Sequence, residues 1–159
     1  MMSRELVIVL HNIRSLHNVG SVLRTADGAG VAKVYMTGYT PSPTDEMGRV
    51  RKEITKTALG AESSVAWEYA PDVSRTIAKL KKDGFSIVAL EQSDGAVDYR
   101  SFVVKGSVAL IAGNEVRGLS SALLEKADAS IVIPMRGKKE SLNVSVAVAI
   151  VTYKLTDTK

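Results

Sequence analysis

The chain has 159 residues, which is enough for one domain that buries a substantial core. It contains no cysteine and only two histidines, His11 and His17, which excludes disulfides, zinc–thiolate sites and thiol nucleophiles; we expect no bound metal. The formal net charge of +4 mildly favours a polyanionic partner, and no apolar run reaches the length of a membrane span.

In chain order, the first half reads strand, helix, strand, loop and short helix. Both strands are short, apolar runs rich in β-branched residues, and the first helix has apolar residues at helical spacing before glycines that suit its C-terminus. The loop is polar and carries a cluster of cations. These elements are residues 5–10 (strand), 18–30 (helix, with Asn18 as a possible cap), 33–38 (strand), 39–53 (loop) and 54–59 (helix).

The second half continues the alternation. One helix is clearly amphipathic, with Asp72 suited to cap its start and Gly84 to end it. The last helix is apolar almost all round, which favours burial on several sides and so a homodimer. The elements are residues 63–70 (strand), 72–84 (helix), 85–92 (strand), 107–114 (strand), 120–126 (helix), 129–135 (strand) and 142–155 (helix).

Apolar strands that alternate with helices predict an α/β fold: a mostly parallel six-stranded sheet covered by helices on both faces. No linker, repeat or low-complexity tract divides the sequence, so we expect a single domain over residues 1–159. The first ten residues place an acid and a base before a short apolar run, unlike a signal peptide, and we expect a cytoplasmic protein.

Parallel sheets bind ligands beyond the carboxyl ends of their strands, so the residues that follow each strand are candidates. After the fifth strand, Gly113 and Gly118 permit close approach of a ligand and flank Glu115 and Arg117; a strand-to-helix turn with solvated charges is the alternative. After the sixth, PMRGKKESLN places cations before a helix N-terminus, which favours anions; a flexible basic surface loop is the alternative.

The first helix carries Gly20 unusually early, which favours close approach of another group, and Arg24 lies further along it. At the start of the last helix, Ser141 suits an N-cap, whereas Asn143 is expected inside the first turn, where no cap is needed and its helix propensity is poor. The position of Asn143 therefore indicates that this residue has a role beyond capping.

Two common nucleotide-binding motifs are absent. GAGVAK, residues 28–33, lacks the third glycine of a dinucleotide fingerprint and follows a helix, and no GxxxxGK[ST] phosphate loop exists. With aromatic residues at 5%, a single-strand binder that stacks bases is disfavoured.

Three segments, NVGSVLRTADGAG, ALIAGNEVRGLS and IVIPMRGKKESLNVSVAVAI, resemble the successive motifs of the SpoU/TrmH family. KTALGAESSVAWEY is similar to the segment that usually lies between the first two, and the resemblance covers roughly residues 6–155. The family consists of RNA ribose 2′-O-methyltransferases within the knotted SPOUT superfamily. Many relatives carry an additional RNA-binding domain at the N-terminus, and we expect no separate RNA-binding extension here.

The resemblance implies a C-terminal trefoil knot, S-adenosylmethionine as cofactor, tRNA or rRNA as partner, a homodimer and no metal. It leaves open whether Arg24 is a base or a positioning group. A knotted base methyltransferase, or an RNA-binding module of the same fold without catalysis, is the alternative. The implied residues are Arg24, Ser141 and Asn143 (catalytic); Leu90, Gly113, Ile133, Met135 and Leu142 (cofactor); and Arg14, Asn18, Glu115, Arg117, Arg49, Arg51, Lys52 and Lys56 (RNA).

Overall fold

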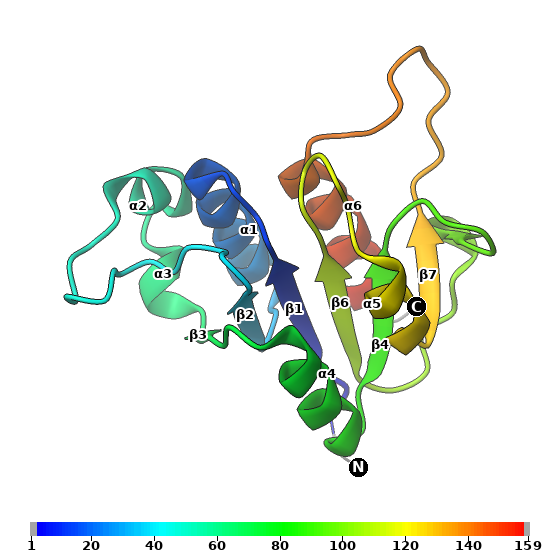
Figure 1. Cartoon of the computed structure of the whole chain (residues 1–159), viewed down its shortest axis with the longest axis horizontal. Coiled ribbons are helices and arrows are strands. Elements are labelled where there is room, and N and C mark those ends of the chain that lie inside the picture. The colour runs from blue at the N-terminus through cyan, green and yellow to red at the C-terminus, as the bar shows by residue number, and fades with distance from the viewer. Residues whose placement is uncertain (1–2, 158–159) are drawn as a thin grey trace.

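A computed structural model describes residues 3–157 and has a parallel sheet at its centre (Figure 1). Within those residues the sheet has seven strands in the order β3-β2-β1-β6-β4-β7-β5, and every paired neighbour is parallel. The strands are β1 (Leu6–His11), β2 (Lys33–Thr37), β3 (Trp67–Tyr69), β4 (Ser86–Leu90), β5 (Val97–Asp98), β6 (Val108–Ala112) and β7 (Ala129–Val132).

The α/β prediction is confirmed, but the prediction of six strands is wrong. The additional strand, β5, has two residues and pairs with β7 at the sheet edge. Two residues are too few for an apolar run or an alternating pattern, so hydrophobic periodicity does not reveal such a strand. The strand predicted over residues 63–70 is also shorter, because residues 63–64 belong to a one-turn helix.

Helices cover both faces of the sheet (Figure 1). In β1, Ile8 and Leu10 pack with residues of α1, α2, α3 and α6, whereas Val7 and Val9 pack with residues of α4 and α5. This is the alternation of a strand that is buried on both sides. The helices are α1 (Leu16–Ala29), α2 (Lys52–Ala58), α3 (Ala61–Ser64), α4 (Val73–Lys82), α5 (Ser121–Lys126) and α6 (Val144–Thr156), with a 3₁₀ turn, η1 (Tyr99–Ser101).

Two predicted caps are wrong. Ser15, not Asn18, caps α1, and its hydroxyl accepts the N–H of Asn18. Asn143, not Ser141, caps α6, because that helix begins at Val144 and leaves Ser141 outside it. The predicted cap at Asp72 is confirmed, since its carboxylate accepts the N–H of Arg75.

Gly20 allows α2 to cross closely over α1. A side chain at this buried position would collide with the Thr57 hydroxyl and with the carbonyl oxygen of Ile54. The Thr57 hydroxyl donates to the carbonyl oxygen of His17 at 2.9 Å. The predicted close approach is therefore that of a neighbouring helix, which sets the cations of α2 beside α1.

Only one side of the last helix, α6, packs against the rest of the chain. Val148, Val151 and Leu155 are buried in the core, whereas Val146 is 48% exposed and Tyr153 is 54% exposed. Within residues 3–157, no helix combines the length and the apolar character that crossing a membrane requires.

Candidate active site

A cavity of about 460 Å³ lies at the carboxyl edge of the sheet. The ends of β4, β6 and β7 and the first residues of α6 contribute to its lining. The structure brings together in this one lining all five residues predicted to hold a cofactor: Leu90, Gly113, Ile133, Met135 and Leu142.

The turn after β6 forms one wall of the cavity. A side chain at Gly113 would come within 2.7 Å of the Leu119 side chain and 2.8 Å of the Gly118 carbonyl carbon, so the turn closes this tightly only around glycine. Asn114 shapes the turn, because its side-chain oxygen accepts the N–H groups of Val116 at 2.9 Å and Arg117 at 2.8 Å. Sequence reasoning missed Asn114.

Glu91 fastens this turn to the end of β4. Its carboxylate accepts the N–H of Leu119 at 2.7 Å and the N–H of Gln92 at 3.1 Å. Gly118, with φ of 65°, lies directly against the carboxylate, and a side chain there would collide with it. The sequence analysis did not identify Glu91 as a site residue. Its position could have indicated it, because an acidic residue directly after Leu90 lies at the same edge of the sheet.

Glu115 links the turn to the start of α1. Its carboxylate accepts the backbone N–H groups of Arg14 and Ser15, both at 3.2 Å, and the side-chain amide of Asn18 at 3.4 Å. Burial acts to raise the pKa of this carboxyl, but the hydrogen bonds, including one from its own backbone N–H, outweigh burial and lower the pKa. The carboxylate link is therefore present at neutral pH and is lost as the pH falls through the lowered pKa.

Asn143 joins the same network from α6. Its amide nitrogen donates to the side-chain oxygen of Asn18 at 3.3 Å, while its own oxygen accepts the N–H of Ser145 at 2.9 Å and that of Val146 at 3.4 Å. One side chain thus caps α6 and contacts α1. Ser141 is exposed and lines the cavity two residues earlier.

Arg24 lies apart from the cavity. It is exposed on α1 and lines a different hollow, of about 480 Å³, together with Lys56 of α2 and Tyr153 of α6. It is not among the described residues that line the cavity. A single chain therefore does not bring Arg24 together with Ser141 and Asn143.

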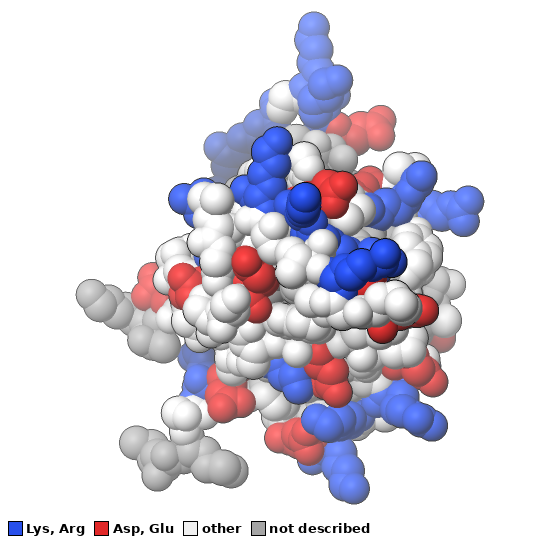
Figure 2. All heavy atoms as spheres, turned by 90° about the vertical axis from the view of Figure 1, so that its left-hand side faces the viewer, with Lys and Arg blue, Asp and Glu red and all other residues white. Residues whose placement is uncertain are grey.

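The remaining predicted RNA contacts are at the surface. Arg14 and Arg117 are exposed, following β1 and β6, and Lys52 and Lys56 are exposed on α2. Figure 2 shows Lys and Arg side chains on the upper part of the face it views, with acidic side chains between them, and further cations along its lower edge.

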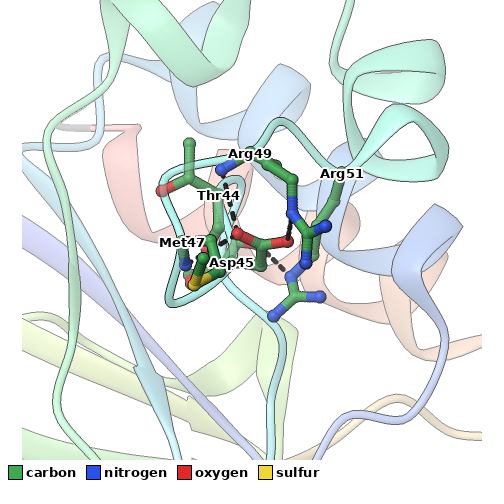
Figure 3. Close-up of polar contacts among 6 residues, drawn as sticks. Thr44, Asp45, Met47, Arg49 and Arg51 are labelled. Atoms are coloured by element: carbon green, nitrogen blue, oxygen red, sulfur yellow. Dashed lines mark hydrogen bonds and ion pairs between the residues drawn. The ribbon is translucent and has the colours of Figure 1, made fainter.

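Arg49 and Arg51 have partners within their own loop (Figure 3). The Asp45 carboxylate accepts the Arg49 backbone N–H and the Arg49 side-chain Nε, both at 2.9 Å, and the N–H of Met47. The Arg49 backbone bond is the main cause that lowers the pKa of Asp45. Arg51 donates to the carbonyl oxygen of Ser42 at 3.0 Å, so Lys52 and Lys56 are more available to a ligand.

A parallel α/β sheet whose glycine turn and last helix line a cavity at the carboxyl edge defines a ligand-binding domain. The chain belongs to the SpoU rRNA Methylase family, whose model matches residues 5–153.

Individual relatives agree with this assignment. A Staphylococcus epidermidis protein of the TrmH family of tRNA/rRNA methyltransferases is 35% identical over 149 residues, which cover 94% of this chain and 57% of that protein. The chain thus spans 57% of the length of the curated relatives it matches.

Solved structures share the fold. An AdoMet-bound rRNA methyltransferase from Sinorhizobium meliloti superposes with a TM-score of 0.87 at 28% identity, over 96% of this chain and 56% of that one. An RNA 2′-O ribose methyltransferase superposes with a TM-score of 0.83 at 28% identity, over 97% of this chain and 56% of that one.

Proposed function

We propose that the protein uses S-adenosylmethionine to methylate a ribose 2′-hydroxyl in tRNA or rRNA. The observation that carries the proposal is the chain of side-chain contacts from Glu115 through Asn18 to Asn143, beside the cavity. It joins three segments that are far apart in the sequence and holds Glu115 and Asn143 at the cavity. Membership of the SpoU family and the similarity to tRNA/rRNA methyltransferases support methyl transfer to RNA, and the similarity to an RNA 2′-O ribose methyltransferase supports the ribose as its target.

The cavity suits S-adenosylmethionine. Its volume, about 460 Å³, falls in the range of small-molecule sites. Leu90, Ile133 and Leu142 offer an apolar surface for an adenine ring, and Gly113 lets a ligand lie against the main chain. Glu91 adds a carboxylate for hydroxyl groups. When bound, the cofactor supplies a methyl group that is electrophilic because it is attached to a sulfonium.

The protein must position the ribose and assist removal of the hydroxyl proton. We assign Ser141 and Asn143, at the cavity and at the cap of α6, to the orientation of the ribose. Arginine is a poor base because it remains protonated. We therefore assign Arg24, which shares a hollow with the cation Lys56, to hold a phosphate next to the target ribose.

A second copy of the chain would bring Arg24 to a cavity. Within one chain Arg24 and the cavity are separate. The exposed residues of α6 include apolar Val146 and, about two turns further along, Tyr153, which shares the hollow with Arg24. We propose a homodimer in which Arg24 of one protomer serves the cavity of its partner, and a trefoil knot in the segment from β6 to α6.

Methyl transfer to bulk RNA with a labelled cofactor, followed by nucleoside analysis, tests the proposed reaction. Label in 2′-O-methylated nucleosides is the expected result. Label in a methylated base would instead identify a knotted base methyltransferase. RNA binding without any transfer would identify a binding module that has lost catalysis.

S-adenosylmethionine should raise the thermal stability of the protein. A ligand that binds only the folded state adds about 2.7 kcal/mol at a hundredfold excess over its dissociation constant. Differential scanning fluorimetry and calorimetric titration measure the effect, with ATP as a control ligand that shares the adenosine. Unchanged melting at saturating cofactor, together with no heat of binding, would show that the cavity is not the cofactor site.

Glu91→Gln should weaken cofactor binding and also lower the free energy of unfolding, by about 1 kcal/mol or more, because one backbone donor of the turn is left unpaired. The amide keeps the shape of the side chain but replaces one acceptor oxygen with a donor, so the N–H of Leu119 or of Gln92 loses its partner. A hydrogen bond from a cofactor hydroxyl to a carboxylate is about 1 kcal/mol stronger than one to a neutral amide, which predicts a loss of about fivefold in cofactor affinity. Calorimetric titration measures it, with exposed Glu125→Gln on α5 as the control; equal affinities in the two variants would contradict the role of Glu91.

A further inference from the structure

Residues 134–142 form a loop that we call the basic arm. Figure 1 shows it rising from the end of β7, away from the rest of the fold, and returning to the start of α6. Residues 136–142 are exposed, and a side chain at Gly137 would meet no atom within 4 Å. No hydrogen bond joins the basic arm to any other part of residues 3–157. Local packing therefore does not hold its middle in place.

The charge of the basic arm has little compensation. Arg136, Lys138 and Lys139 are accompanied within it by one acid, Glu140. Across residues 3–157, none of the three cations forms an ion pair. Arg136 acts on Asp98 only as the weakest of the interactions at that carboxyl, whose pKa is lowered to about 2 chiefly by hydrogen bonds from Arg100.

The two ends of the basic arm, unlike its middle, belong to the cavity. Met135 on one side and Glu140 to Leu142 on the other line it, while Arg136, Lys138 and Lys139 do not. A segment that served only to cover the cavity would have no use for three uncompensated cations at its outer part. These charges are therefore available to a ligand that lies outside the cavity mouth.

We propose that the basic arm is an RNA-docking surface, in which Arg136, Lys138 and Lys139 bind phosphates of the strand that enters the site. The inference rests on the proposed function. Arg14 and Arg117 are exposed at the same edge of the sheet, so an RNA strand that crosses the cavity mouth meets cations from three loops. Phosphates suit such an arm because they recur along the strand and are bound through charge, without a fixed pocket.

The test compares two double variants with equal loss of charge. Lys138→Gln/Lys139→Gln alters the basic arm. Lys81→Gln/Lys82→Gln alters exposed lysines at the end of α4, on the face of the sheet opposite to α1 and α6. Binding of unfractionated tRNA is measured over a salt series, and cofactor binding is measured by calorimetry. The slope of log affinity against log salt is negative, and each lost phosphate contact makes it shallower by about 0.7 to 0.9, so in the basic-arm variant it should become shallower by about 1.4 to 1.8.

The expected result is this loss of slope in the basic-arm variant, an unchanged slope in the α4 variant and wild-type cofactor affinity in both. Equal slopes in the two variants, with normal RNA binding by the wild type, would overturn the inference and leave the proposed function intact. A basic-arm variant that loses cofactor affinity and keeps the RNA slope would overturn it in favour of a cover for the cavity. A wild-type protein that neither binds nor methylates RNA would overturn the proposed function as well.

Discussion

Arg24→Ala should reduce methyl transfer by about 100-fold, the effect expected when a reacting group is misplaced by about 1 Å. Cofactor affinity should not change, because Arg24 is not among the described residues that line the cavity. Stability should not change either, since the side chain is exposed on α1 and makes no hydrogen bond with another residue of the described chain. Single-turnover methyl transfer, calorimetric titration and thermal melting measure the three quantities.

Two further variants sharpen the result. Arg75→Ala removes an exposed arginine from α4, on the opposite face, and should keep full activity. Arg24→Lys keeps the charge but loses the planar fork, so substantial activity in this variant would mean that charge alone suffices. Retention of most activity by Arg24→Ala would show that the assigned role is wrong.

A linked dimer shows which chain Arg24 serves. Asn143→Ser keeps an oxygen that can cap α6 but removes the amide that donates to Asn18, so it disables the site and spares the helix. With Arg24→Ala and Asn143→Ser in the same subunit, sites shared across the interface each hold one defect, and activity should be lost. With the two substitutions in opposite subunits, one shared site is intact and about half of the activity should remain; the reverse pattern would mean that each site is built within one chain.

The convergence of the cavity residues could be predicted from the sequence. Apolar runs mark β4, β6 and β7, and the rule that parallel strands end at one edge singles out Gly113 after β6, whereas Leu90 and Ile133 are implied by the family resemblance. The contacts that fix the turn could not be predicted. Glu91 bonds to Leu119, 28 positions away, and Asn114 bonds to Tyr39, 75 positions away, and nothing in local periodicity reports such pairs.

The error over Ser141 and Asn143 has a physical cause. Propensity identifies a polar residue that suits a cap but not the turn at which the helix starts, and both residues suit a cap. The structure selects Asn143 because its amide group can also contact Asn18 of α1, which a serine at that position could not do with the same reach. Tertiary contact thus sets the boundary of α6, and the same contact draws α6 into the site.

Two substitutions on α6 should separate folding from assembly. Val148 is fully buried in the core, so Val148→Glu should unfold the protein, because an unpaired buried charge costs several kcal/mol out of a total stability of about 5–15 kcal/mol. Val146 is 48% exposed and lies three residues after the cap, where a glutamate is favourable to an isolated helix. Val146→Glu should therefore fold normally, yet place two like charges at the proposed interface and yield a monomer that binds cofactor and has lost methyl transfer. Circular dichroism and sedimentation velocity distinguish the cases, with Tyr69→Glu, 51% exposed on β3 at the other edge of the sheet, as the control that should remain dimeric. A wild-type protein that is monomeric and fully active at the assay concentration would refute both the dimer and the shared site.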